Sequence, residues 1–121
     1  MQLFWGKIIG GQKRGKTLGF PTANMALHKN IPEGIYVSSV RIDKKWHNAL
    51  TFVGKAITFG ATKPFAESYL MDFSGNLYGK YITVKLLEKI RENKKFDSAA
   101  ELIKQMEKDF GVAKQYFEKK F

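Results

Sequence analysis

A glycine-rich basic loop near the N-terminus contains the residue types that bind phosphate. Gly11 and Gly15 have no Cβ, so backbone amides in this loop can approach an anion closely. Arg14 and Lys16 add positive charge to the same segment. The loop therefore predicts a binding site for a phosphorylated ligand, although a Gly/Lys loop is by itself also typical of an ordinary turn.

Two oxygen-bearing side chains follow this loop. Pro21 fixes its own backbone φ, and Thr22 and Asn24 alternate along the extended segment after it, so their side chains point to one face. Mg²⁺ prefers oxygen ligands and keeps several waters and phosphate oxygens, so one hydroxyl and one amide suit it. The loop and this pair together predict a site for a nucleoside triphosphate with its Mg²⁺.

The order of these residues is more specific than their types. Residues 11–24 read Gly-x-x-x-Gly-Lys-x-Leu-Gly-Phe-Pro-Thr-Ala-Asn, which closely resembles the riboflavin kinase family. Further segments keep the order of that family: Pro32–Tyr36, Gly54–Phe59, Glu67–Phe73, Leu77–Gly79, Arg91 and Lys95–Ser98. The resemblance covers nearly the whole chain, and it is to the kinase domain that many bacteria join to an FMN adenylyltransferase domain.

This resemblance implies a reaction and its residues. The γ-phosphoryl group of ATP would pass to the ribityl 5′-hydroxyl of riboflavin, giving FMN and ADP. Glu67 matches the catalytic carboxylate, which would accept or orient the hydroxyl proton, and Thr22 and Asn24 match the ligands of Mg²⁺ or another divalent metal. The ATP-binding residues would be Gly11, Gly15, Lys16, Thr22, Asn24 and Tyr78. The flavin-binding residues would be Glu67, Arg91 and Phe96.

One segment departs from the family pattern. Where the family commonly reads Asn-Ile-Gly-x-Arg-Pro-Thr-Phe, residues 52–59 read Phe-Val-Gly-Lys-Ala-Ile-Thr-Phe. Contacts made by the missing Asn, Arg and Pro side chains do not carry over. Most other aromatic side chains, among them Tyr69 and Phe73, are expected in the core.

Composition excludes several classes of protein. The chain has 121 residues and no cysteine, so one domain without disulfides or thiolate zinc sites is expected. No apolar run approaches the roughly 18 residues that span a bilayer, and the first residues lack the layout of a signal peptide. A cytoplasmic monomer that binds no membrane fits these features. The net charge of +10 favours an anionic ligand.

Periodicity predicts an all-β core followed by helix. Short β-branched and aromatic runs alternate with Gly, Pro and Asn, and residues 43–46 and 73–77 are hairpin candidates. After Phe96 the spacing of apolar residues changes to that of a helix. Ser98 and Glu101 form a capping box at its start, and Gly111 is predicted to break it. We expect a closed six-stranded antiparallel, Greek-key-like β-barrel over about residues 1–90. One or two C-terminal α-helices should cover about residues 97–120.

Two other functions are compatible with the sequence. The altered segment at residues 52–57 is compatible with a flavin-binding module with weakened catalysis. The basic charge is compatible with a β-barrel that binds single-stranded RNA through exposed aromatics interleaved with Lys and Arg. Because the aromatics occupy core-like alternating positions, nucleic-acid binding is not expected.

Overall fold

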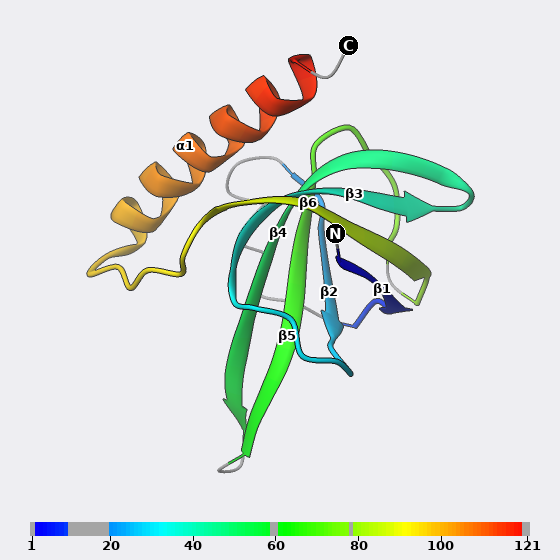
Figure 1. The fold of residues 1–121 in the computed structure, drawn as a ribbon, viewed down its shortest axis with the longest axis horizontal. Coiled ribbons are helices and arrows are strands. Elements are labelled where there is room, and N and C mark those ends of the chain that lie inside the picture. The colour runs from blue at the N-terminus through cyan, green and yellow to red at the C-terminus, as the bar shows by residue number, and fades with distance from the viewer. Residues whose placement is uncertain (1, 10–19, 59–60, 78, 120–121) are drawn as a thin grey trace.

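Alternation of apolar and polar side chains produces the strands of this protein. In β1, for example, Phe4 is buried while its neighbours Leu3 and Trp5 are exposed. The computed structural model describes residues 2–9, 20–58, 61–77 and 79–119 (Figure 1). Its elements are β1 (Gln2–Lys7), β2 (Thr22–Ala26), β3 (Gly34–Ile42), β4 (Lys45–Thr58), β5 (Ala61–Leu70), β6 (Tyr81–Arg91) and α1 (Ala99–Glu118).

The strands form one antiparallel sheet in the order β1-β6-β3-β4-β5-β2. The sheet curls so that its edge strands β1 and β2 approach each other. Within the described residues these edges are joined at the isolated bridge Ile9–Asn24, where the Ile9 amide donates to the Asn24 carbonyl at 2.7 Å. The six-stranded antiparallel sheet is confirmed, but its edges form no ladder here, so the described structure is an open half-barrel rather than a closed barrel.

The two predicted hairpins have different outcomes. Asp43 and Lys44 adopt φ of 49° and 72° between β3 and β4, which matches the positive φ values of a type I′ hairpin turn. The second prediction was wrong, because the segment at residues 73–77 does not join paired strands. After it the chain crosses over, and β6 pairs with β1 and β3 instead of β5. Turn residues favour a reversal but do not choose the partner strand.

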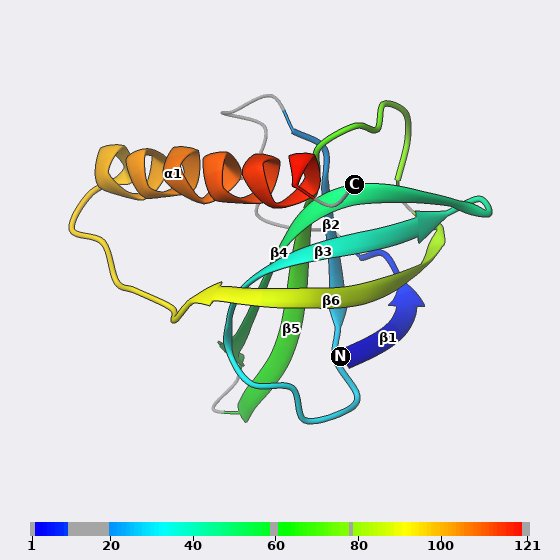
Figure 2. The ribbon, with the colours of Figure 1, turned by 45° about the horizontal axis from the view of Figure 1, so that its top comes forward.

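The sheet has a core on each of its faces. The interior of the half-barrel contains residues such as Phe4, Met25 and Leu70. On the convex face, Ile35, Val37, Leu50, Tyr69 and residues of α1 form a second apolar cluster. Figure 2 shows α1 lying across this face. Leu70 of β5 therefore faces the interior, whereas Glu67, three residues earlier, points to the convex face together with Tyr69.

The helix α1 begins where the sequence predicted. The Ser98 hydroxyl accepts from the Glu101 amide at 3.2 Å, and the Glu101 carboxylate accepts from the Asp97 amide at 3.3 Å, which is a capping box. The predicted break at Gly111 was wrong, because α1 continues through it to Glu118. A helical glycine costs about 1 kcal/mol relative to alanine. Burial of Phe110 and Ala113 on either side stabilises the continuous helix.

Candidate active site

The strand register brings the predicted metal ligands to the predicted catalytic carboxylate. β2 pairs with β5 so that Asn24 lies directly opposite Glu67 and Thr22 opposite Tyr69. Directly opposed residues on paired strands point to the same face, with Cβ atoms about 5 Å apart. Asn24 and Glu67 are 9% and 1% exposed. Two sequence segments far apart in the chain therefore place oxygen donors side by side on the convex face.

Glu67 is a buried carboxylate with one oxygen unsatisfied. Its Oε1 accepts a hydrogen bond from the Tyr69 hydroxyl at 2.6 Å. Its Oε2 is buried and has no hydrogen-bond partner in the part of the chain that the structure describes. A buried acceptor without a donor costs about 1 to 3 kcal/mol, more for a charged group, so native proteins rarely leave one without a functional reason. A substrate hydroxyl or a cation would satisfy it.

The oxygen donors here also fit a hard cation. Thr22 and Asn24 contribute a hydroxyl and an amide from one strand, and Glu67 lies opposite Asn24. Oxygen ligands of this kind suit Mg²⁺, and the unsatisfied Glu67 Oε2 is the observation that favours a ligand at this place. No group of three or more His, Cys, Asp or Glu residues occurs within the described ranges, so a transition-metal centre of that type is not seen there.

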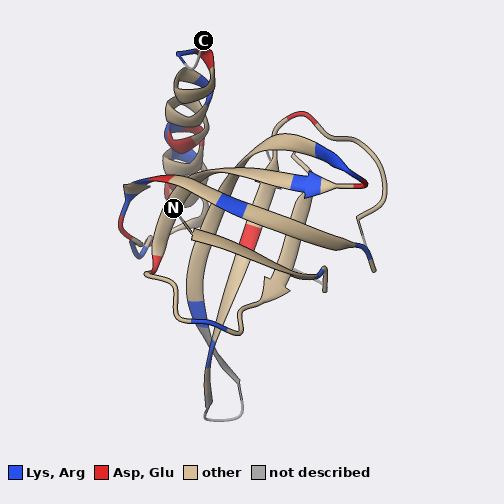
Figure 3. Cartoon of the chain, turned by 45° about the vertical axis from the view of Figure 1, so that its right-hand side comes forward, with Lys and Arg blue, Asp and Glu red and all other residues tan. Residues whose placement is uncertain are grey.

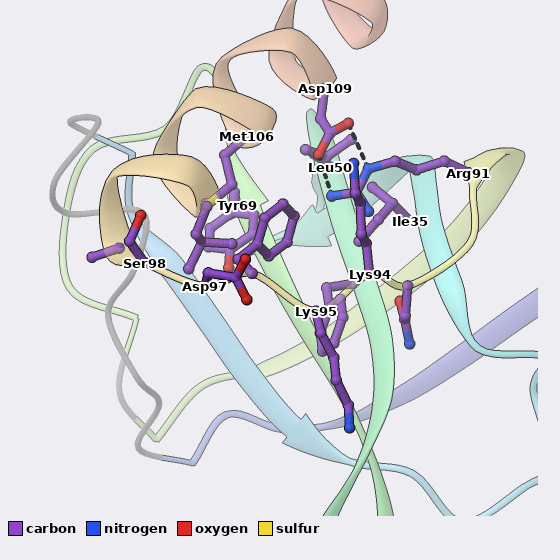
Figure 4. A pocket seen from close by; sticks show the side chains of 15 residues that line it. Ile35, Leu50, Tyr69, Arg91, Lys94, Lys95, Asp97, Ser98, Met106 and Asp109 are labelled. Carbon is purple, nitrogen blue, oxygen red and sulfur yellow. Dashed lines mark hydrogen bonds and ion pairs between the residues drawn. The ribbon is translucent and has the colours of Figure 1, made fainter.

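A cavity of about 810 Å³ lies between the convex face and the start of α1 (Figure 4). The segment after β6 closes one side of it, and the sheet and helix provide apolar walls. Arg91 and Phe96, both predicted to bind flavin, line this cavity. Tyr69, which the sequence analysis assigned to the core, also lines it and connects it to Glu67 through its hydroxyl. The other lining residues include Ile35, Leu50, Phe52, Asn93, Lys94, Lys95, Leu102, Met106 and Asp109.

Arg91 is held by an ion pair that sequence reasoning missed. Its Nε donates to Asp109 Oδ1 at 2.8 Å and its second terminal nitrogen donates to Asp109 Oδ2 at 2.6 Å. The Gln105 amide donates to the same carboxylate at 3.1 Å, and Asp109 is 3% exposed. Bidentate pairs of this type fix the plane of a guanidinium. One signal could have revealed Asp109: it is an acidic residue three positions after Met106, within the apolar stripe of the helix.

Aromatic rings extend the wall beside this pair. Phe110 stacks on Phe20 with ring centroids 4.1 Å apart, and its ring meets Tyr69 edge to face at 5.8 Å. These contacts tie α1 to the segment just before β2 and to β5. The helix is therefore positioned against the same strands that carry Asn24 and Glu67.

Several predicted site residues lie outside the described residues. These are Gly11, Gly15, Lys16 and Tyr78, all assigned to ATP binding. The remaining predicted residues fall into two groups: Thr22, Asn24 and Glu67 on β2 and β5, and Arg91 and Phe96 in the cavity wall. Tyr69 lies between the two groups. In the described part of the structure, no helix is both long and apolar enough to cross a membrane.

Comparisons with known proteins identify relatives over nearly the whole chain. The family model for flavokinase, described as riboflavin kinase, matches residues 3–117. A bifunctional riboflavin kinase/FMN adenylyltransferase from Haemophilus influenzae is 39% identical over 93% of this chain and 38% of its own length. A Bacillus subtilis protein named RNA-binding riboflavin kinase is 33% identical over 98% of this chain and 52% of its own length. The chain thus spans about two fifths to one half of the length of these relatives.

Solved structures show the same architecture. A Streptococcus pneumoniae chain described as a macrolide-efflux protein superposes with a TM-score of 0.81 at 35% identity, covering 93% of this chain and 38% of that one. A riboflavin kinase from Trypanosoma brucei superposes with a TM-score of 0.64 at 21% identity, covering 98% of this chain and 80% of that one. The second likeness supports the fold alone.

Proposed function

Because this chain belongs to the riboflavin kinase family, we propose that it transfers the γ-phosphoryl group of ATP to the 5′-hydroxyl of riboflavin, producing FMN and ADP. The buried Glu67 carboxylate carries the proposal, since its Oε2 has no partner among the described residues and lies on the strand opposite Asn24. A primary hydroxyl of the substrate would complete its hydrogen bonding. The carboxylate would then orient that hydroxyl and accept its proton.

The residues on β2 would hold the phosphate end of ATP. Phosphoryl transfer needs an in-line nucleophile and neutralisation of the phosphate charges more than covalent help from the protein. Thr22 and Asn24 would hold a divalent metal, Mg²⁺ by preference, and when bound the metal would neutralise phosphate oxygens. Gly11, Gly15 and Lys16 of the glycine-rich basic loop, together with Tyr78, would contact ATP.

The cavity under α1 would take the flavin ring system. Its volume of about 810 Å³ lies within the usual range of about 300 to 1,000 Å³ for small-ligand sites. Phe96 would provide a flat apolar surface, and Arg91, oriented by Asp109, would meet the polar edge of the ring. Tyr69 would hold Glu67 in one orientation through its 2.6 Å hydrogen bond. The ribityl chain would run from the cavity toward Glu67.

The test separates turnover from binding. FMN formation from riboflavin, ATP and Mg²⁺ is measured by chromatography for the wild type, for Glu67→Gln and for Glu88→Gln. Glu88 is exposed on β6 and serves as a matched control. Loss of a general base lowers kcat by about 10²- to 10⁴-fold, so Glu67→Gln should lose turnover while riboflavin affinity, measured by fluorescence quenching, changes little. Wild-type turnover in Glu67→Gln would refute the assignment of Glu67.

The same measurements decide the other candidates. Riboflavin binding by the wild type without FMN formation would identify a flavin-binding module with weakened catalysis. We also propose that the kinase acts in the cytoplasm, where ATP is available as its phosphate donor, and that it works as a monomer. The name of one relative includes RNA binding. Replacement of the kinase activity by RNA binding is disfavoured by the buried carboxylate and its neighbouring oxygen donors, which an RNA-binding barrel does not need.

A further inference from the structure

The convex side of the sheet has a second region that α1 does not cover. The chain contains two tryptophans, and both are exposed here: Trp5 at 71% and Trp46 at 48%. Tyr81 is 66% exposed on the neighbouring strand. We call this region the aromatic–basic face, and it consists of Leu3, Trp5, Lys7, Arg41, Trp46, Tyr81 and Lys85. None of these residues belongs to the candidate active site.

The strand register arranges these side chains in a row. Trp5 on β1 pairs with Thr83 on β6, and Thr83 pairs with Arg41 on β3. Arg41 in turn pairs with Trp46 on β4. Paired residues share a face, so Trp5, Arg41 and Trp46 lie on one line across four strands. With strands about 4.8 Å apart, the backbone positions of Trp5 and Trp46 are about 14 Å apart along the sheet, and Arg41 lies between them beside Trp46.

Of the two neighbouring rows, one again places a cation beside an aromatic ring and the other adds a further cation. Lys7 pairs with Tyr81, and Lys85 pairs with Leu3 on one side and with Ser39 on the other. The outward positions of these rows contain Lys, Arg, Ser, Thr, Asn and apolar residues, and no carboxylate. Figure 3 shows Lys and Arg on β6 and on both arms of the β3–β4 hairpin, and the acidic colour at the hairpin tip belongs to Asp43. There Asp43 is paired with Lys80 at 2.7 Å.

A groove continues this face along β1. It has a volume of about 500 Å³ and is lined by Leu3, Trp5, Lys7, Lys29 and Tyr81, with residues of the segment after β2. Lys29 donates to the Leu3 carbonyl and so borders the groove with a second cation beside Lys7. The groove gives an extended ligand a path past Trp5 and Tyr81.

We propose that the aromatic–basic face binds single-stranded nucleic acid. Proteins that bind single strands combine aromatic platforms, on which bases stack, with cations that follow the phosphates, and both features alternate here. Charge favours this ligand over a second copy of the chain. If two copies met through this face, Lys7, Arg41 and Lys85 of one copy would lie against the same cations of the other and repel them. Double-stranded DNA would hide its bases from the indole rings.

The test uses a labelled oligouridine and a labelled oligothymidine of about 12 nucleotides, within the usual site size of such proteins. Fluorescence anisotropy gives affinity, and quenching of tryptophan emission reports stacking directly, since both tryptophans lie on the face. Trp5→Ala should weaken binding about fivefold or more. With three cations engaged, raising KCl from about 50 to about 200 mM should weaken binding about twentyfold.

Matched variants decide the outcome. The triple variant Lys7→Ser, Arg41→Ser, Lys85→Ser should lose most of the affinity and most of the salt dependence. The control replaces Lys104, Lys108 and Lys114, which are exposed on α1, by Ser and removes the same charge elsewhere. Equal loss in both triple variants, or anisotropy changes without tryptophan quenching, would overturn the proposal. Concentration-dependent dimerisation that Trp5→Ala abolishes, without oligonucleotide binding, would overturn it in favour of self-association.

Discussion

The ion pair between Arg91 and Asp109 connects the stability of α1 to the shape of the flavin cavity. Asp109→Asn keeps the shape of the side chain but removes its charge, so an amide nitrogen faces the guanidinium in place of one carboxylate oxygen. The whole Asp109 residue is only 3% exposed to solvent. Two hydrogen bonds of 2.8 Å and 2.6 Å join its carboxylate to Arg91. We expect loss of both stability and riboflavin affinity.

The structure sets the size of this effect. Removing one partner of a fully buried ion pair costs about 3 to 5 kcal/mol. The Arg91 side chain is 20% exposed, so its guanidinium can recover part of its hydration, and the lower end applies. We therefore expect Asp109→Asn to reduce the free energy of unfolding by about 3 kcal/mol. The double variant Arg91→Met, Asp109→Leu, which buries no unpaired charge, should be more stable than Asp109→Asn.

Urea denaturation measures the stability, and riboflavin fluorescence quenching measures the affinity. Glu107→Gln, at an exposed position of the same helix, is the control and should change neither. Because Arg91 without its partner no longer has a fixed orientation, riboflavin binding in Asp109→Asn should weaken more than turnover at saturation. A loss of stability below about 0.5 kcal/mol, the usual range for a surface substitution, would refute the reasoning. Unchanged riboflavin affinity would refute the role of the pair in the cavity.

Two further predictions concern the helix and the pH dependence of stability. Gly111→Ala should raise the free energy of unfolding by about 0.5 to 1 kcal/mol, because Gly111 lies inside α1 and an added Cβ would meet no described atom within 4 Å. A lower melting temperature for this variant would contradict the continuous helix. Burial raises the pKa of Tyr36, whose hydroxyl donates to the Pro32 carbonyl at 2.5 Å. The folded state therefore keeps this proton to a higher pH than the unfolded state does. The corresponding stability is complete below about pH 10 and is lost as the pH rises above it. In Tyr36→Phe, denaturation curves should show a smaller decline above about pH 10, and a decline equal to that of the wild type would exclude Tyr36 as its source.

Local chemistry was readable from the sequence. The capping box at Ser98 and the hairpin at residues 43–46 depend on residues close together in the chain, so neighbouring residue types determine them. The same holds for most of the strands, because alternation along a strand is a local property. The candidate site residues came from the order of such motifs.

Pairing between distant segments was decided by the tertiary structure. The order of the strands placed β6 between β1 and β3, and the register placed Asn24 opposite Glu67. The ion pair between Arg91 and Asp109 forms only because α1 packs on the sheet. None of these contacts leaves a signal within a short window of sequence.

The exposed aromatic residues also show the difference between what the local sequence determines and what the tertiary structure decides. The sequence analysis expected most aromatic side chains in the core, but alternation did not tell which of them, such as Trp5 and Tyr81, would stay exposed. A period of two tells which side chains share a face of a strand, whereas burial depends on what covers that face. Here α1 covers one part of the convex side and leaves the other open, and the position of a packed helix is a property of the whole fold.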